Sequence, residues 1–599
     1  MISRHFALRR IAIAATCFAT LSSATAAVTD TLCSKNCFEK RWVYFAGDIV
    51  SSPAVYDKLI AVMKRAKALG YNGIALNGGG GAAYSVMQDP RPGSMPSKYR
   101  AVFAAAAKAA EETQIELIPI GGGMEVPGIR DASLLEAMPA TNTPFLVEGA
   151  NAYPIGDALI KDSEDDKSFE LDPPAAAWRL IDSSTTYDTT VHRNGQRSVK
   201  FTQKNPAGFS RVFREVKLRK HAAFRMSFWM RSENYDGKLR IQIMDAPLDA
   251  APIYQNASSD LGFTSVLNGW SKNVLPATQD QWVKYSIDFN TGNNEIARIW
   301  IGTWTNSATQ SGAAWLDDIE IKEIGLAHAI RRDSLPITVS SEDGSIVYVE
   351  GKDYKVDIES LQIPQTTSIR PGQRLAVTAY QSAQNMISMF GTPANSCNGR
   401  YFEIQAENYR QIVDLLSQNQ VTPSEKIFLY YDENRVFNWD PSCKTTTAGG
   451  YLRDTFLGHQ NAILKVNPNA ELFVWHDMFD PNANAIEKYW AVNGSLKDSS
   501  DGILERTTVV NWTNSKKGHP VESLKFFSDK KRKQIIAGYY DDETPELDEM
   551  RAWLAALDTA ESQGVTGVNG FMYTTFTGKF DDLEAVTKYI KEHSNRWPE

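Results

Sequence analysis

The chain has 599 residues, of which 43% are hydrophobic and 22% are charged. This length exceeds what one hydrophobic core usually supports, and it predicts two or three domains. The balance of apolar and charged residues excludes a disordered, collagen-like or coiled-coil protein. With 63 Lys and Arg against 71 Asp and Glu, the formal net charge is −8, so neither a nucleic acid nor an anionic membrane is an expected partner.

The first 26 residues have the order of charges and apolar residues that is typical of a secretory signal peptide. Three arginines within the first ten residues precede the apolar run from Ile11 to Leu21, and Ala24-Thr25-Ala26 supplies small residues for cleavage. We therefore expect a secreted or periplasmic protein that is cleaved near Ala26. No later run approaches about 18 uninterrupted apolar residues, so no membrane span is expected.

Four of the five cysteines lie after this segment, at positions 33, 37, 397 and 443. An even number of cysteines in an exported protein suggests disulfides, namely Cys33–Cys37, which would close a very small loop, and Cys397–Cys443. A zinc site made by all four is the alternative, but neither a C-x-x-C spacing nor a nearby histidine cluster supports it. We expect no metal and no cofactor.

Residues 27–160 and 326–599 alternate short apolar segments with helical patterns. The first region contains strand-like segments at 43–46, 73–76 and 116–120, and the second contains six more, at 375–380, 426–431, 471–475, 508–512, 534–540 and 568–573. Short apolar runs that alternate with helices indicate a parallel sheet of βα units. A (β/α)8 barrel needs eight strands, so one of these nine is expected to lie outside it, and Leu375–Tyr380 is the favoured one.

Residues 161–325 show a different pattern, because short segments that alternate between apolar and polar residues replace the helical periodicity. Examples are Phe224–Trp229, Leu239–Ile243, Trp282–Ile287 and Ala297–Ile301. This period of two predicts an antiparallel β-sandwich. The closing segment, Ala314–Ile321, resembles the last strand of jelly-roll carbohydrate-binding modules. The expected fold is therefore α/β, a (β/α)8 TIM barrel interrupted by an inserted antiparallel sandwich of the jelly-roll type.

Polar and aromatic residues recur where the strands of the predicted barrel end. Active sites of such barrels lie at the carboxyl ends of the strands. An aromatic ring stacks on the apolar face of a sugar, while carboxylates bind hydroxyl groups or transfer protons, so the pattern predicts an oligo- or polysaccharide partner. The candidate substrate-binding residues are Asp48, Asn77, Tyr380, Trp475, Asp477, Trp512, Tyr540, Asp541 and Tyr573.

The strongest catalytic motif is the acidic pair in Tyr431-Asp432-Glu433-Asn434-Arg435, where a strand gives way to its loop. Adjacent residues of a strand point to opposite faces, so both acids reach one site only at such a boundary. Here the chain resembles the hexosaminidase superfamily, family 20 of the glycoside hydrolases and its relatives, in which an Asp-Glu pair ends the fourth barrel strand. The resemblance implies that Glu433 is the general acid/base and that Asp432 orients the 2-acetamido group of the substrate.

Two further segments are similar to that superfamily. Val474–Asp480 is similar to its fifth-strand region with a tryptophan, and Val510-Asn511-Trp512 to its sixth. The usual His-x-Gly-Gly before the acidic pair is replaced by Phe428–Tyr431. The resemblance implies a secreted, retaining glycoside hydrolase that acts on N-acetylhexosamine-containing glycans with the substrate's own acetamido group as nucleophile.

The sequence alone leaves other functions open. A glycosidase of non-acetylated polysaccharides would need a separate carboxylate nucleophile, for which Asp477 and Asp541 are candidates. A glycan-binding protein without turnover would keep the aromatic residues but not the acid/base chemistry. A lyase of acidic glycans usually needs a basic site, and a deacetylase a metal triad; neither pattern is found. The sequence does not indicate an oligomeric state.

Overall fold

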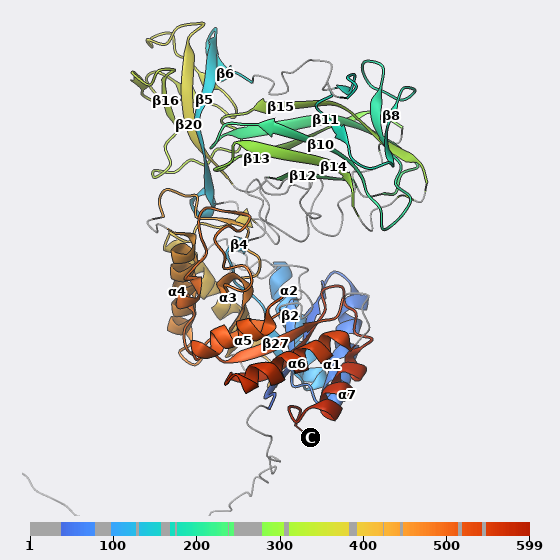
Figure 1. Ribbon diagram of the computed structural model, residues 1–599. Helices are drawn as coiled ribbons and strands as arrows, with labels where there is room; N and C mark the ends of the chain where they lie inside the picture. Colours follow the sequence, from blue (N-terminus) through green and yellow to red (C-terminus); the bar gives the residue numbers. More distant parts are fainter. Residues whose placement is uncertain are drawn as a thin grey trace, which may run out of the picture.

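The computed structural model describes residues 37–77, 97–126, 131–156, 168–173, 176–237, 239–244, 278, 280–304, 309, 311–382, 392–422, 425–443, 447–512, 518–541 and 547–598. The expected signal peptide, residues 1–26, and Cys33 lie outside these ranges. Within them, the chain forms an eight-stranded parallel sheet with helices around it and three antiparallel sheets of four, five and seven strands (Figure 1). No helix in these ranges is long and apolar enough to cross a bilayer.

The parallel sheet has the strand order β22, β24, β26, β27, β28, β1, β2, β3. An isolated parallel bridge joins its two edges, from Ile120 directly after β3 to Phe428 in β22, and the Gly121 N–H donates to the Phe428 carbonyl at 2.9 Å. The sheet is therefore nearly closed and barrel-like. Its strands are β1 (Lys40–Ala46), β2 (Gly73–Asn77), β3 (Glu116–Pro119), β22 (Lys426–Leu429), β24 (Glu471–Trp475), β26 (Thr508–Asn511), β27 (Gln534–Tyr539) and β28 (Val568–Thr574).

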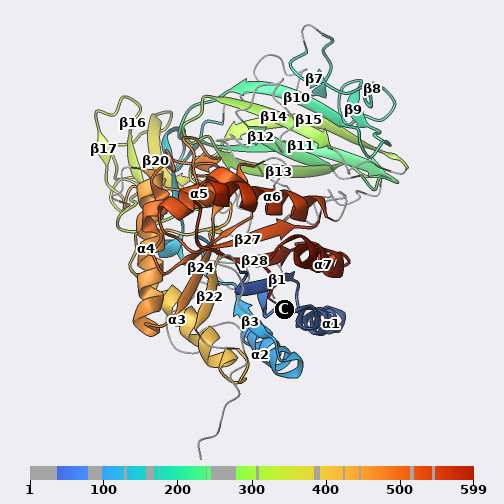
Figure 2. The same cartoon turned by 60° about the horizontal axis from the view of Figure 1, so that its bottom comes forward.

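The described helices pack against the outside of this sheet, as Figure 2 shows from a second direction. Each buries one apolar stripe, as the last one does with Leu583, Val586 and Ile590. The α-helices are α1 (Pro53–Leu69), α2 (Ser97–Thr113), α3 (Arg400–Leu416), α4 (Ala448–Val466), α5 (Pro520–Asp529), α6 (Asp548–Ser562) and α7 (Leu583–His593), with short 3-10 turns η1 (Ala132–Leu134), η4 (Asp477–Phe479) and η5 (Ser499–Gly502).

Side chains of the parallel strands alternate between the interior of the sheet and its helix-covered outer face. The interior is largely aromatic: the rings of Trp42 and Phe473 lie 4.7 Å apart, and those of Phe428 and Trp475 lie 4.6 Å apart. A strand that is buried on both faces is apolar throughout, which explains the continuous apolar runs of the sequence. The interior is therefore a packed core, and polar groups enter it at the two ends of the strands: ion pairs of Lys40 with Glu471 and of Lys426 with Glu116 at the amino ends, and the candidate site at the carboxyl ends.

Two antiparallel sheets between residues 179 and 323 face each other across a second core. Alternate residues of β11, among them Phe224, Met226 and Phe228, enter this core, in agreement with the predicted period of two. The four-stranded sheet has the order β12 (Arg240–Met244), β14 (Ile296–Thr303), β10 (Ser210–Lys217), β7 (Arg179–Leu180), and the five-stranded sheet has the order β13 (Val283–Asn290), β11 (Ala223–Glu233), β15 (Ala313–Glu323), β9 (Ser198–Phe201), β8 (Thr185–Asp188).

A seven-stranded antiparallel sheet was not expected from the sequence. The segment Leu375–Tyr380 belongs to it and not to the parallel sheet, because β20 buries only every second residue and pairs antiparallel with β5. Residues 137–154 and 338–382, which the sequence pattern assigned to the βα array, supply its strands in the order β17 (Val347–Tyr348), β16 (Thr338–Ser341), β20 (Arg374–Ser382), β5 (Ala137–Glu148), β6 (Asn151–Pro154), β19 (Leu361–Gln362), β18 (Lys355–Val356).

Two small strand pairs lie beside the carboxyl end of the parallel sheet. β4 (Glu125–Val126) pairs antiparallel with β21 (Thr392–Pro393). β23 (Val436–Phe437) pairs in parallel with β25 (Ala491–Val492). The second pair directly follows the acidic motif along the chain, so it fixes the loop that carries Asp432 and Glu433.

Candidate functional site

The inward-facing residues at the carboxyl ends of the parallel strands form the candidate site. Tyr44 of β1 and Trp475 of β24 belong to the interior cluster, and Trp512 packs against it. Asn77, the last residue of β2, donates from Nδ2 to the Tyr44 hydroxyl at 3.0 Å. Burial, together with the nearby carboxylates of Asp432 and Asp541, raises the pKa of Tyr44, so its hydroxyl stays protonated beside the acidic pair.

The acidic pair follows β22 at the point where the strand leaves its regular path. Asp432 is 6% exposed, whereas the Glu433 side chain keeps 23% of its surface exposed. Glu433 has a φ of +44°, in the left-handed region that non-glycine residues rarely adopt. Such conformations concentrate at functional sites, where the surrounding structure must hold them.

The carboxylate of Glu433 is held by a residue of its own loop. Arg435 Nη2 lies 2.9 Å from Glu433 Oε2, and its guanidinium stacks over the ring of Trp490 at 4.1 Å. Arg435 and Trp490 directly precede β23 and β25, whose pairing brings them together. This contact joins two segments far apart in sequence, so no local motif predicted it.

Asp477 lies beside Glu433 but is fully buried. Its Oδ2 accepts the Glu433 backbone N–H at 2.9 Å and the Asn484 side-chain amide at 2.8 Å. Burial raises the pKa of Asp477, and the neighbouring Glu433 carboxylate raises it further, whereas these two donors and Trp512 lower it. The geometry therefore makes Asp477 a buried support for the acid loop.

Several buried polar atoms at the strand ends have no hydrogen-bond partner within the described part of the chain. Such atoms are rare in native proteins, and a hydroxyl-bearing ligand or ordered water would satisfy them. Three belong to the last residue of a parallel strand and the fourth follows the acidic pair. They are Asn77 Oδ1, Trp475 Nε1, Thr574 Oγ1 and Asn434 Oδ1.

An exposed aromatic ring lies at the rim of the same end. Phe576, just after β28, is 44% exposed, and its ring centre lies 5.1 Å from that of Tyr44 and 6.1 Å from that of Tyr539. An exposed ring beside carboxyl groups suits the apolar face of a sugar. Tyr44, Phe576 and Thr574 were not predicted from the sequence, although the period of two counted from Met572 would have placed Thr574 inward.

Two predicted tyrosines lie away from the site. Tyr540 and Tyr573 stack on each other at 4.2 Å in the layer between the parallel sheet and the helices, and the Tyr573 hydroxyl donates to the Lys579 carbonyl at 3.0 Å. Both point outward, since Ala537 and Met572 of the same strands point inward and adjacent residues alternate. The structure therefore places neither ring among the inward-facing residues of the candidate site.

Three further predicted residues make other contacts within the protein. Asp541 accepts hydrogen bonds from the hydroxyls of Thr575 and Thr577 and so closes the loop after β28. Burial raises the pKa of Asp48, but hydrogen bonds from Lys98 and Ser51 outweigh it and hold the pKa at about 2. Tyr380 lies opposite Pro139 in the seven-stranded sheet and not at the end of a parallel strand.

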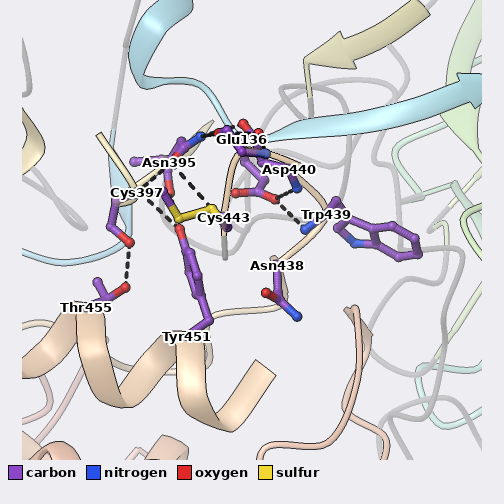
Figure 3. The surroundings of a disulfide bond; sticks show 12 residues. Glu136, Asn395, Cys397, Asn438, Trp439, Asp440, Cys443, Tyr451 and Thr455 are labelled. Atoms are coloured by element: carbon purple, nitrogen blue, oxygen red, sulfur yellow. Dashed lines mark hydrogen bonds between the residues drawn. A yellow bond between two sulfur atoms is a disulfide. The ribbon is translucent and has the colours of Figure 1, made fainter. Parts of the chain in front are cut away.

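The loop that follows β23 is anchored by a disulfide and a buried glutamate (Figure 3). The predicted Cys397–Cys443 disulfide is confirmed. Glu136, just before β5, accepts the backbone N–H groups of Trp439 and Asp440 through Oε1, at 2.6 and 3.0 Å. Among the described residues, no three His, Cys, Asp or Glu side chains are arranged to hold a metal.

Comparison with known proteins finds no matching family model and no matching curated protein. Among solved structures, the chain is similar to the CBM22-1 xylan-binding domain of Paenibacillus barcinonensis Xyn10C, with 15% identity, a TM-score of 0.20, and coverage of 28% of this chain and 95% of that one. It is also similar to a rhamnosidase from Novosphingobium sp. PP1Y, with 11% identity, a TM-score of 0.34, and coverage of 92% of this chain and 56% of that one. A carbohydrate-binding module of Cellvibrio mixtus lichenase 5A in complex with cellotriose matches at 16% identity and a TM-score of 0.17, over 24% of this chain and 88% of that one. Likenesses at these TM-scores do not assign a function.

Proposed function

We propose that the protein is an exported glycoside hydrolase whose active site lies at the carboxyl end of the parallel sheet. In this proposal, the sheet is a (β/α)8 barrel, a jelly-roll sandwich is inserted into it, and a leader is removed near Ala26. The observation that carries the proposal is the acidic pair, because Asp432 and Glu433 leave β22 together and Glu433 keeps part of its carboxyl side chain exposed. The exposed ring of Phe576 and the unpartnered polar atoms of the strand ends support a polyhydroxylated substrate.

Glu433 is the proposed general acid/base, and Asp432 the residue that orients a 2-acetamido group, as in the hexosaminidase-like enzymes that the motif resembles. The proposed substrates are glycans that contain N-acetylhexosamine. Two carboxylates that could act as a separate nucleophile are already engaged. Asp477 is fully buried against the Glu433 N–H, and Asp541 accepts hydrogen bonds from the loop after β28. This arrangement favours attack by the acetamido oxygen of the substrate itself.

The first test is hydrolysis of a panel of aryl glycosides, including N-acetylglucosaminides, N-acetylgalactosaminides and plain hexosides, by the purified mature protein. Glu433→Gln should lower kcat by about 10²–10⁴-fold while the fold is kept, because the amide has no proton to transfer. Glu407→Gln is the matched control, since Glu407 is a buried, ion-paired glutamate on α3 away from the site. Unchanged turnover by Glu433→Gln would remove Glu433 from this role.

A second test separates substrate assistance from a protein nucleophile. A thiazoline analogue of the cyclised intermediate should inhibit strongly, because it carries the charge that Asp432 is proposed to stabilise. Asp432→Asn should reduce both turnover and this inhibition by more than about tenfold. Efficient cleavage of a substrate without the acetamido group, together with no effect of thiazoline, would contradict the mechanism.

A further inference from the structure

The backbone of Glu433 needs an external support. Its φ of +44° lies in the left-handed region, where the Cβ of any residue other than glycine crowds the following carbonyl. Residue 433 is not glycine, so neighbouring groups must stabilise its left-handed backbone conformation. The direction of the Glu433 side chain depends on it, because a change to a negative φ would rotate the Cα–Cβ bond away from its present course.

The support comes from the loop after the next strand of the sheet. The Glu433 N–H donates to Asp477 Oδ2 at 2.9 Å. Asn484 holds the same residue twice, because its side-chain amide donates to Asp477 Oδ2 at 2.8 Å and its backbone N–H to the Asp477 carbonyl at 3.0 Å. Asp477 is the first residue of the 3-10 turn η4, so its backbone position is fixed independently of its contact with Glu433.

Asp477 is enclosed by protein, and its Oδ2 is committed to the acid loop. Its relative exposure is 0%, and the oxygen that faces the acid loop already accepts two hydrogen bonds. Trp512 lies close enough to the Asp477 carboxyl group to lower its pKa. The two hydrogen bonds of the Asp477 side chain both go to Oδ2, and its buried Oδ1 has no hydrogen-bond partner among the described residues.

We infer that Asp477 is a positioning residue that holds Glu433 in the left-handed conformation and so directs the Glu433 carboxyl group. The inference rests on the proposed function only in naming Glu433 as the acid/base. It assigns to Asp477 neither proton transfer nor attack on the sugar. What Asp477 supplies is a hydrogen-bond acceptor at a fixed place, and an amide oxygen supplies the same. A misplacement of the reacting group by about 1 Å is enough to cost on the order of 10²-fold in rate.

The test compares Asp477→Ala, which removes the acceptor, with Asp477→Asn, which keeps an acceptor oxygen and removes the charge. Asp477→Ala should lower kcat by about 10²-fold with KM within about twofold, because substrate contacts are unchanged. Asp477→Asn should recover kcat to within about tenfold of wild type. Asp353→Ala is the control, because Asp353 is a buried aspartate that accepts the Val349 N–H at 3.0 Å, far from the site, and its loss should leave kcat unchanged.

Crystal structures of the two Asp477 variants provide a readout that does not depend on activity. The φ of residue 433 should become negative in Asp477→Ala and stay positive in Asp477→Asn. If wild type hydrolyses no glycan, the proposed function fails and this comparison still decides the inference. A positive φ in Asp477→Ala, or equal loss of kcat in both variants, would overturn it. If Asp477→Ala does not fold, Asp477→Ser, whose hydroxyl is too short to reach the N–H, serves the same comparison.

Discussion

Buried carboxyl groups hold the loops around the candidate site by accepting backbone N–H bonds. Asp477 does so for Glu433, and Glu136 does so for Trp439 and Asp440. Burial raises the pKa of Glu136 to about 8, although the Trp439 N–H and the charge of Arg332 oppose the shift. Glu136 therefore keeps its proton near neutral pH in the folded protein, and it acts there as a neutral acceptor.

Glu136→Gln should make thermal stability less dependent on pH. The pKa of Glu136 rises from 4.5 to about 8 on folding, so its stabilising contribution is fully present below about pH 4.5 and is lost as the pH rises through about 8. The variant does not titrate, so its Tm relative to wild type should increase by roughly 5 °C between pH 5 and pH 9. Differential scanning calorimetry at each pH measures this difference.

The control for this experiment is Glu136→Ala. That variant also removes the acceptor of two backbone N–H groups, so its Tm should fall below wild type at every pH. A Tm difference between Glu136→Gln and wild type that stays constant from pH 5 to pH 9 would show that Glu136 is ionised in the folded protein.

At the scale of elements, the loop after β23 connects the antiparallel sheets to the parallel sheet. Trp439 donates from its indole to the Ala491 carbonyl at 2.7 Å, and the His221 ring packs edge-on against it at 6.2 Å. The turn between β13 and β14 completes the contact, because Asn293 donates to Asn493 at 3.1 Å and Gly292 faces the Trp439 ring. The sandwich thus supports the loop after β23, the strand that follows the acidic pair.

Gly292→Ala should weaken this contact. A Cβ at Gly292 would lie 2.7 Å from the Trp439 ring, and the φ of +51° adds backbone strain. We expect a loss of about 2–3 kcal/mol in the free energy of unfolding and a lower kcat, measured by denaturant unfolding and by hydrolysis.

The matched control is Gly344→Ala, at a φ of +73° with no atom within 4 Å of the added Cβ. It introduces the same kind of backbone strain without a clash, so it should cost only about 1 kcal/mol and leave kcat unchanged. Equal effects of the two substitutions would mean that the Gly292 contact with Trp439 does not matter.

At the scale of the whole molecule, the parallel and antiparallel parts have separate cores. The clusters around the parallel sheet take their buried residues from before 125 and after 408, and the sandwich cluster takes its own from 169 to 321. The chain leaves the parallel part through β5 and returns through β20, where Pro139 lies opposite Tyr380. The two segments that join the antiparallel part to the parallel part are therefore adjacent.

A shortened chain in which an Asn-Gly turn joins Pro139 directly to Tyr380 should therefore still fold. We expect a helical far-UV circular dichroism spectrum and an intact Cys397–Cys443 disulfide. The Tm should be lower than that of the full chain by roughly 5 °C, because Trp439 loses its contacts with His221 and Gly292. Separately expressed residues 168–325 should give a β-type spectrum. An unfolded shortened chain would show that the parallel sheet needs the antiparallel part.

Features that follow from local sequence patterns, such as the ends of the parallel strands, could be predicted. Features that depend on strand register or on contacts between distant segments could not. Asp432, Glu433 and Trp475 could be placed because each ends an apolar run. The outward direction of Tyr540 and Tyr573 could have been predicted by counting the alternation from the inward residues Ala537 and Met572. The seven-stranded sheet was missed because several of its strands are only two residues long. The contact of Arg435 with Trp490 depends on a strand pair that only the tertiary structure creates.

During synthesis, β3 leaves the ribosome long before its partner β22, because the strands of all three antiparallel sheets lie between them in the chain. Until Phe428 arrives, the β3 edge of an apolar parallel sheet has no neighbour, and such edges promote aggregation. The antiparallel parts are able to fold during this interval, since the sandwich has its own core. The order of the strands along the chain therefore leaves this apolar edge exposed until the second half of the parallel sheet has been made.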